Sequence, residues 1–234
     1  MAAATRHVHY LPALWAAASH GRIQKVKHLL TNGADIEERG GPYKSTPLHI
    51  ASLSSYEEVV LILLEMTADV SVKNKDGETP LHYAALGGHT IVARLLLSKG
   101  ADVSATDNHG RMPLHFAVNE NVAKLLIEHG AELSATASDG TTALHCAAVQ
   151  GRAAVLQLLL DKGADVQSKS NDGMTPFDVA TAGSHHQIAA ILKAEAKRRA
   201  MSEAFAMGQQ ERLGAGSWVQ ELEAGVVRMV LEQV

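Results

Sequence analysis

Histidine is frequent in this chain, with 13 copies in 234 residues, and the chain also has one cysteine, Cys146. Imidazole titrates near neutral pH and binds zinc, and a thiolate is a nucleophile or a metal ligand. These residues could therefore support a metal site, proton transfer or thiol chemistry. Four histidines end similar strings, STPLH, ETPLH, RMPLH and TTALH, as His49, His82, His115 and His145. Their chemistry depends on the repeated element that carries them.

A two-part motif recurs along the chain. From His49 onward the first part is spaced by 33, 33, 30 and 33 residues, and its last copy has Asp178 at the histidine position. A weaker copy at 11–18 places Trp15 there, 34 residues before His49. The second part reads NGADI, MTADV, KGADV, HGAEL and KGADV. In the fourth copy the two parts are 15 residues apart instead of 18, which predicts a shorter turn between two helices.

The third copy predicts two helices and a finger. Thr79 is expected to cap the first helix, with Pro80 at the first helical position and Gly87-Gly88 at the end. Thr90 is expected to cap the second helix, which ends near Gly100. An extended finger then leads to the next copy. Neither helix can bury its apolar face alone, so successive copies must stack.

The G-x-TPLH-x-AA opening and the LL-x-x-GAD close resemble the ankyrin repeat family over about residues 10–195. The resemblance implies an all-α solenoid of about six helix-turn-helix repeats with β-hairpin fingers. It divides the chain into an N-terminal tail at 1–9, the repeat domain at 10–195 and a C-terminal helical extension at 196–234. It also implies a non-catalytic scaffold or adaptor for protein–protein interaction. Departures from the pattern include Trp15 in the first repeat, Thr67 in place of glycine in the second and Phe177-Asp178 in the sixth.

The repeated histidines are poorly spaced for metal binding. Stacked helices lie about 8–10 Å apart, whereas zinc needs each nitrogen within about 2.1 Å, so equivalent histidines cannot share one ion. We therefore expect no metal and no cofactor. The family resemblance instead implies that each imidazole joins a threonine hydroxyl to the finger backbone across repeats. The residues expected in this structural role are Thr46, His49, Thr79, His82, His115, Thr142 and His145.

The other reactive groups do not form a catalytic set in the sequence. Cys146 occupies the position held by Ile50, Tyr83 and Phe116 in other copies, so we expect it to pack in the core. His185-His186 matches the start of a second helix and is expected to cap it or to face solvent. The chain has no Gly-rich phosphate loop, HExxH or GxSxG string, and its aspartates follow the repeat register. The sequence thus predicts no catalytic residues and no enzyme.

The positions that differ between copies lie in the fingers and at the ends of the first helices, where the resembled family binds partners. They mix both charges with a few apolar residues, and a solvated face is the alternative for any one of them. The residues expected to bind a protein partner are Lys75, Asp76, Glu78, Leu86, Asn108, His109, Arg111, Asn119, Ser138, Asp139, Thr141, Gln150, Asn171, Asp172 and Met174. The adjoining helix-end positions include Ser19, His20, Leu53, Ser54, Gly87, Val118 and Val149.

Two further helices are expected after the last repeat. One runs from Gln187 to Leu213, and a capping-box pattern at Ser217 opens another that reaches Val234. The last helix either docks on the repeats as a cap or binds a partner. LEAGVVRMVLEQV at 222–234 resembles the start of an F-box, which implies an alternative function for 217–234 as the adaptor-binding segment of a ubiquitin-ligase substrate receptor. Against that pattern, Glu223 stands at the proline position.

Composition limits the classes of partner and compartment. The formal charge of −4 gives no indication of a nucleic-acid partner. The longest apolar run, Val59 to Leu64, is far shorter than the roughly 20 residues that span a bilayer, and MAAATRHVHY at the start lacks the apolar region of a signal peptide. A single cysteine fits a reducing compartment. We therefore expect an intracellular protein that binds no membrane, in the cytoplasm or alternatively in the nucleus.

Overall fold

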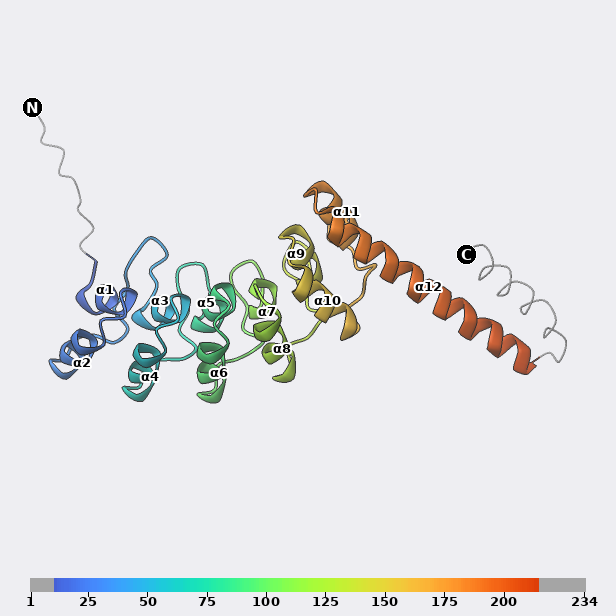
Figure 1. The fold of residues 1–234 in the computed structure, drawn as a ribbon. Helices are drawn as coiled ribbons and strands as arrows, with labels where there is room; N and C mark the ends of the chain where they lie inside the picture. Colours follow the sequence, from blue (N-terminus) through green and yellow to red (C-terminus); the bar gives the residue numbers. More distant parts are fainter. Residues whose placement is uncertain (1–10, 215–234) are drawn as a thin grey trace, which may run out of the picture. The chain divides into compact units, whose positions relative to one another are not determined.

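The computed structural model describes residues 11–214. Within this range it contains twelve α-helices and no β-strand, so the all-α repeat architecture predicted from the sequence is confirmed (Figure 1). The chain divides into two compact units, one that ends at Ala189 and one that begins at Ala190. The helices are α1 (Ala13–Ser19), α2 (Ile23–Thr31), α3 (Pro47–Leu53), α4 (Glu57–Glu65), α5 (Pro80–Gly87), α6 (Thr90–Ser98), α7 (Pro113–Phe116), α8 (Glu120–Glu128), α9 (Ala143–Val149), α10 (Ala153–Asp161), α11 (Pro176–Ala182) and α12 (His186–Gly214).

The first unit is a stack of two helical layers. The inner layer contains α1, α3, α5, α7, α9 and α11, each in contact with the next, and the outer layer contains α2, α4, α6, α8 and α10 (Figure 1). The leucine that precedes the histidine position is buried in each of the first five repeats, as Leu14, Leu48, Leu81, Leu114 and Leu144. Alanines fill the remaining inner positions because the two layers pack closely. This arrangement explains a composition rich in small and aliphatic residues and poor in aromatic ones.

In the third repeat the inner helix begins as the sequence predicts, whereas the outer helix does not. Thr79 is the N-cap of α5 and Pro80 its first residue, and Gly88 ends the helix in the left-handed conformation. For α6, however, the expected cap at Thr90 is wrong, because the N-cap is His89. The His89 ring bonds through Nε2 to the Leu53 carbonyl at 2.8 Å, 36 residues away. His185 makes the equivalent bond to the Val149 carbonyl at 2.9 Å.

Three of the repeated histidines link their own helix to the following finger. Nδ1 of His49, His82 and His145 lies 2.8–2.9 Å from the hydroxyl of the N-cap threonine. In each ring Nε2 faces a carbonyl 29 residues ahead at 2.9–3.0 Å, which assigns the proton to Nε2. The carbonyls belong to Glu78, Arg111 and Met174. Burial lowers the pKa of His49 and His82 to about 4, so these rings are neutral at pH 7.

The fourth and sixth repeats vary this linkage. Met112 replaces the threonine in repeat four, and Nε2 of His115 is buried with no partner in hydrogen-bond geometry. In repeat six Asp178 accepts from the Thr175 amide and hydroxyl at 2.8 and 2.7 Å, but its short side chain does not extend this linkage to another finger. The hydrogen bonds lower the pKa of the Asp178 carboxyl. Asp178 therefore retains only the capping part of the histidine's role.

The three residues missing from repeat four shorten its first helix. The shorter turn between the helices that the spacing predicts is wrong, because α7 has only four residues and ends at Phe116. The Arg152 guanidinium donates to the carbonyls of Phe116 and Ala117 at 3.1 and 2.9 Å. Asn119 caps α8 through the Val122 amide and also donates to the Gly88 carbonyl at 2.8 Å. Arg152 thus satisfies carbonyls at the end of α7 that a longer helix would have paired.

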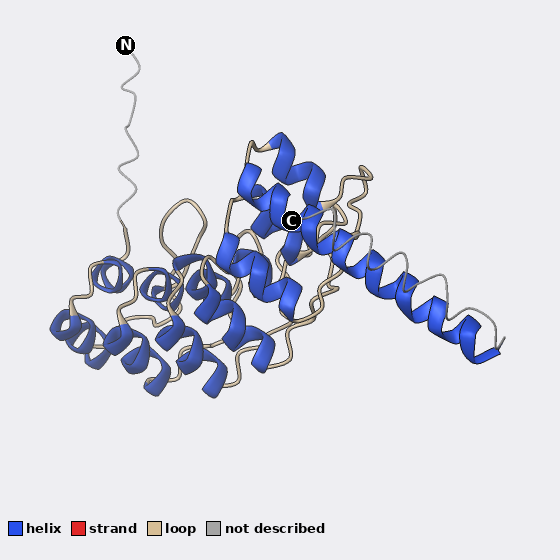
Figure 2. Cartoon of the chain, turned by 45° about the vertical axis from the view of Figure 1, so that its right-hand side comes forward, coloured by secondary structure: helices blue, strands red, loops and turns tan. Residues whose placement is uncertain are grey.

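The fingers are turns joined tip to tip. Within 11–214 their sheet-like pairing is limited to two isolated bridges, so they are shorter than the β-hairpins that were expected. Figure 2 shows them as loops. Each tip amide donates to a carbonyl of the preceding finger at 2.8–2.9 Å, as in Lys75 to Tyr43 and Asn108 to Asp76. Ser138 to His109 and Asn171 to Asp139 continue the series. The fingers therefore form a continuous hydrogen-bonded row.

The helix expected at 187–213 is observed as α12, His186–Gly214. In the second unit Glu195 pairs with Arg198 and Arg199 at 2.6 Å each, and these hydrogen bonds lower the pKa of the Glu195 carboxyl to about 2. The helix and the F-box-like segment expected at 217–234 lie outside the described residues, as does the tail at 1–9. The domain boundaries proposed from the sequence stay predictions.

We predict that His82→Ala lowers the free energy of unfolding by about 1–3 kcal/mol at pH 7, because it leaves the Arg111 carbonyl and the Thr79 hydroxyl without their buried partner. Urea unfolding measures the change. His109→Ala is the matched control, since this histidine is exposed on a finger. Equal stability of His82→Ala and the wild type would contradict the prediction.

The stability difference between the wild type and His82→Ala should also depend on pH. Unfolded imidazole titrates near 6.5 and folded His82 at about 4, so the unfolded state binds more protons between these values. The stability that neutral His82 contributes is complete above about pH 6.5 and is lost as pH falls toward 4. The difference between wild type and His82→Ala should therefore narrow over this interval.

Candidate partner-binding groove

A cleft of about 510 Å³ lies between the first finger and the inner helices of repeats one to three. We call it the groove. Its walls come from α1, the finger that joins repeats one and two, the C-terminal halves of α3 and α5, and the next two fingers. The residues that line it are Trp15, Gly40, Gly41, Pro42, Tyr43, Ser45, Ile50, Leu53, Asp76, Glu78, Tyr83, Leu86 and Arg111.

One end of the groove is shaped by Trp15, which occupies the histidine position of repeat one. Its amide donates to Glu38 at 2.6 Å, and its ring packs under Gly40 and Gly41. A Cβ added at Gly40 would lie 2.6 Å from the indole, so only glycine fits there. Nε1 of Trp15 is buried without a hydrogen-bond partner, an arrangement that costs about 1–3 kcal/mol. Trp15 thus exchanges the histidine linkage for aromatic packing against the first finger.

Tyr83 and Ile50 form the floor of the groove. The Tyr83 hydroxyl lies 2.9 Å from the Ser45 hydroxyl and 3.1 Å from the Asn74 amide nitrogen, so it is held between two fingers. Its ring meets the ring of His49 edge-on, with centroids 5.2 Å apart. Burial raises the pKa of Tyr83, and the carboxylates of Glu78 and Asp76 raise it further. Hydrogen bonds to two fingers therefore fix the position of the Tyr83 ring on the floor.

The charged rim is organised around Arg111. Its guanidinium pairs at 2.7 Å with Asp107, whose side chain is fully buried, and lies 3.9 Å from Glu78. It also stacks on Phe116, 4.5 Å from the ring centroid. These contacts fix the guanidinium, and the hydrogen bonds from Arg111 and His109 lower the pKa of Asp107. Arg111 is thus positioned before any partner arrives.

Apolar side chains at the mouth of the groove face solvent. Tyr43 is 54% exposed on the first finger, and Leu86 is 42% exposed at the end of α5. Leu53 and Ile50 are half-buried beside them. An exposed cluster of aromatic and aliphatic residues with a charged rim has the composition of a protein-binding surface.

The structure brings only some of the predicted partner-binding residues together. Four of them, Asp76, Glu78, Leu86 and Arg111, line the groove. A smaller hollow of about 260 Å³ collects His109, Ser138 and Asp139 with Arg111 and Ala137. The remaining predicted residues line neither cavity: Lys75, Asn108, Asn119, Thr141, Gln150, Asn171, Asp172 and Met174.

Several of the remaining residues have structural contacts. The side-chain amides of Asn108 and Asn171 each donate to a carbonyl of the preceding finger at 3.0 Å. The Met174 carbonyl accepts the His145 bond. Thr141 donates through its amide and hydroxyl to Asp139 at 2.9 and 2.6 Å, and these hydrogen bonds lower the pKa of Asp139. Variation between copies therefore marks residues of the finger row as well as surface residues.

The groove is also lined by Trp15, Tyr43, Ile50 and Tyr83, which were not predicted from the sequence as partner-binding residues. Two signals could have found them. The residue after the repeated histidine lies on the groove floor, and it is apolar in several copies. The step of 34 residues from Trp15 to His49 indicates one extra residue in the first finger, where Tyr43 lies.

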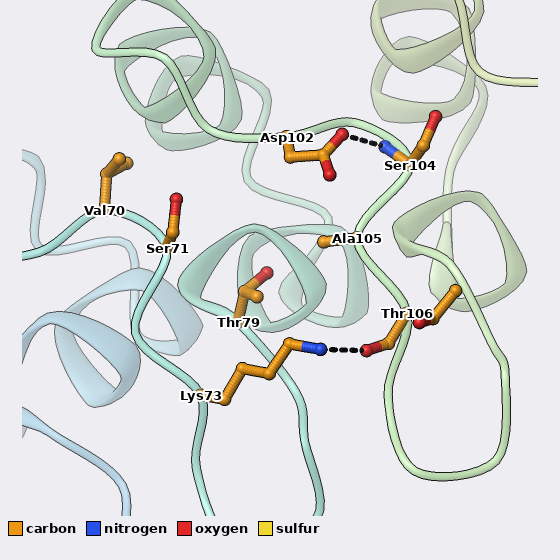
Figure 3. Close-up of a pocket in the computed structure, with 8 residues that line it drawn as sticks. All are labelled: Val70, Ser71, Lys73, Thr79, Asp102, Ser104, Ala105 and Thr106. Atoms are coloured by element: carbon orange, nitrogen blue, oxygen red, sulfur yellow. Dashed lines mark hydrogen bonds between the residues drawn. The ribbon is translucent and has the colours of Figure 1, made fainter.

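A further, polar cavity of about 280 Å³ lies between the loops that precede the second and third fingers (Figure 3). Lys73 reaches across it to the Thr106 carbonyl at 2.8 Å, and Asp102 accepts from the Ser104 amide at 2.8 Å. Both charged side chains that line this cavity are thus already hydrogen-bonded within the protein. It is a weaker candidate site than the groove.

Cys146 is half-buried, like Ile50 and Phe116 at the equivalent positions of other repeats. Burial raises the pKa of its thiol to about 11, which leaves it protonated at neutral pH and a poor nucleophile. Among the described residues, no three histidine, cysteine, aspartate or glutamate side chains are grouped to hold a metal ion. The four repeated histidines instead follow the stack, one in each of repeats two to five.

Comparison with known families now gives the class of protein. A family model described as "Ankyrin repeats (3 copies)" matches residues 5–74, 67–137 and 122–200. The chain therefore belongs to the ankyrin repeat family. Proteins of this family are generally non-catalytic, and their repeats support a role in protein interaction.

Individual relatives are similar over shorter segments. Protein phosphatase 1 regulatory subunit 27 of Homo sapiens is 42% identical over 75 residues, which are 32% of this chain and 48% of that protein. Ankyrin repeat and SOCS box protein 5 of Bos taurus is 41% identical over 63 residues, 27% of this chain and 18% of that protein. Palmitoyltransferase ZDHHC17 of Rattus norvegicus is 36% identical over 63 residues, which are 27% of this chain and 10% of that protein. The chain thus covers less than half of each relative.

Among the residues that the structure describes, no helix is both long enough and apolar enough to cross a bilayer.

We predict that Gly40→Ala destabilises the fold by about 1–3 kcal/mol, because the new methyl group displaces the Trp15 ring. In a Trp15→Leu background the same change should cost less than about 0.5 kcal/mol, since the indole is gone. Denaturant unfolding of the four proteins of this cycle measures the coupling. Additive effects would show that Gly40 is not required by contact with Trp15.

Proposed function

We propose that this protein is a non-catalytic adaptor that binds a protein partner through the groove and the adjoining finger residues. The observation that carries the proposal is the exposed cluster of Tyr43 and Leu86 beside a preorganised Arg111. Hot spots at protein interfaces combine aromatic and arginine anchors in pockets with a polar surround. The proposal is supported by the ankyrin repeat family, whose repeats serve protein interaction.

Leu86→Arg should weaken partner binding by at least about tenfold, because it places a charge in the apolar mouth of the groove. Ile91→Arg is the matched control, since Ile91 is a 56% exposed aliphatic residue on the outer helix α6. Quantitative affinity capture from cell extract compares the two variants with the wild type. A partner retained by both variants, or lost from both, would contradict binding in the groove.

A second proposal is that the chain is a substrate receptor of a ubiquitin ligase, with residues 217–234 recruiting the ligase. Its support is the F-box-like string at 222–234 and the name of one relative, which includes a SOCS box. That relative matches over only 18% of its length. The groove would then hold the substrate.

Deletion of 215–234 separates the two functions. A ligase component captured by the full chain should be lost on deletion, whereas the groove partner should remain. Identical captures with and without the segment would reject the ligase proposal and leave the adaptor proposal intact.

A further inference from the structure

The groove has more negative than positive charge available to a ligand. Its charged lining residues are Asp76, Glu78 and Arg111. Arg111 uses Nε and Nη2 on the buried carboxylate of Asp107, so its charge is already balanced inside the protein. Glu78 accepts from the Asn74 side chain at 2.9 Å and lies 3.9 Å from Arg111. Asp76 is thus the carboxylate whose charge is least compensated.

Asp76 is also well placed to meet a ligand. Its backbone is fixed on both sides, since the amide donates to the Asn74 side chain and the carbonyl accepts from the Asn108 amide, each at 2.9 Å. The side chain is half-buried at the groove wall, and no cation of the described residues forms an ion pair with it within 4.0 Å. A carboxylate held in a partly desolvated wall attracts a cation more strongly than a freely exposed one.

The rest of the groove lining is mostly aromatic and aliphatic, so it favours an apolar group. Trp15, Tyr43 and Tyr83 provide aromatic surfaces, and Ile50, Leu53 and Leu86 provide aliphatic ones. A volume of about 510 Å³ is in the range of cavities that enclose a sizeable apolar group. Asp76 lies among the same lining residues, so one short segment can reach both features.

We propose that the groove binds a segment of a partner protein that inserts an apolar side chain between the first finger and α5 and pairs a neighbouring Lys or Arg with Asp76. This inference rests on the proposed function and adds the chemistry of the partner. The uncompensated charge of Asp76 favours a cationic segment. An acidic segment is disfavoured because Asp107 already balances the charge of Arg111.

The test selects ligands without assuming their identity. Phage-displayed random twelve-residue peptides are selected on the full-length protein, and the enriched sequences are synthesised for fluorescence anisotropy. We expect the enriched peptides to share an apolar residue with a Lys or Arg a few positions away. Binding should weaken about tenfold with Asp76→Asn and further with Asp76→Lys. Glu65→Gln, an exposed acid on α4, is the matched charge control.

Charge exchange makes the test specific. A peptide in which Glu replaces the cation should bind Asp76→Lys better than it binds the wild type. Thermal unfolding of each variant checks that the fold is intact, and Asp76→Asn, which keeps the size of the side chain, covers the case in which Asp76→Lys is unstable.

Other outcomes overturn the inference in distinguishable ways. Peptides that no longer bind Leu86→Arg but bind Asp76→Asn as tightly as the wild type would refute the cationic partner. The groove would remain the binding site. Enrichment of acidic peptides would also refute a cationic partner. Dimerisation of the wild type that Leu86→Arg abolishes would refute it too, because a second copy of the chain would then occupy the groove. Peptides that bind Leu86→Arg normally, or a selection with no Leu86-dependent peptide, would count against the groove itself.

Discussion

The rest of the structure depends on the hydrogen bond that a neutral, buried imidazole donates to a carbonyl of the following finger. A stack of thin two-helix layers has no single core, so each layer needs a directional link to the next. His49, His82 and His145 provide it by joining an N-cap threonine to a carbonyl of the following finger. Two of the acceptor carbonyls belong to Glu78 and Arg111, which also line the groove. The structural linkage therefore sets the position of the surface that we propose for binding.

Repeats one and four lack the complete histidine linkage and differ from the other repeats in local structure. Trp15 cannot make the bond, and its ring instead fills the space under Gly40 and Gly41, which creates the aromatic end of the groove. His115 keeps its ring but leaves Nε2 unpaired, within a helix shortened to four residues. Arg152 compensates for the lost turn by binding its free carbonyls. A regular fold thus tolerates local deviations when a neighbouring side chain supplies the missing partner.

The fingers combine structural and surface roles. Their tips are hydrogen-bonded in a row, and asparagine side chains at two tips strengthen that row. A residue such as Asn108 varies between copies but is already engaged with its neighbour, whereas Asp76 offers its carboxylate to the groove. Burial, hydrogen bonding and position in the cleft, and not variability alone, separate residues that hold the scaffold from candidates for recognition.

The sequence by itself determined the all-α repeat fold, the starts of the inner helices at Thr46, Thr79 and Thr142, and the path of α12 almost to the residue. These features are local, because capping, proline position and apolar periodicity act within a few residues. Variation between the copies also indicated five of the groove residues, Leu53, Asp76, Glu78, Leu86 and Arg111. The sequence did not reveal that Trp15, Tyr43 and Tyr83 meet in one cleft, that the deletion in repeat four shortens α7, or that His89 caps α6 and bonds a helix 36 residues away. Only the tertiary structure decided these points, because they depend on side chains from different repeats that come together when the layers stack.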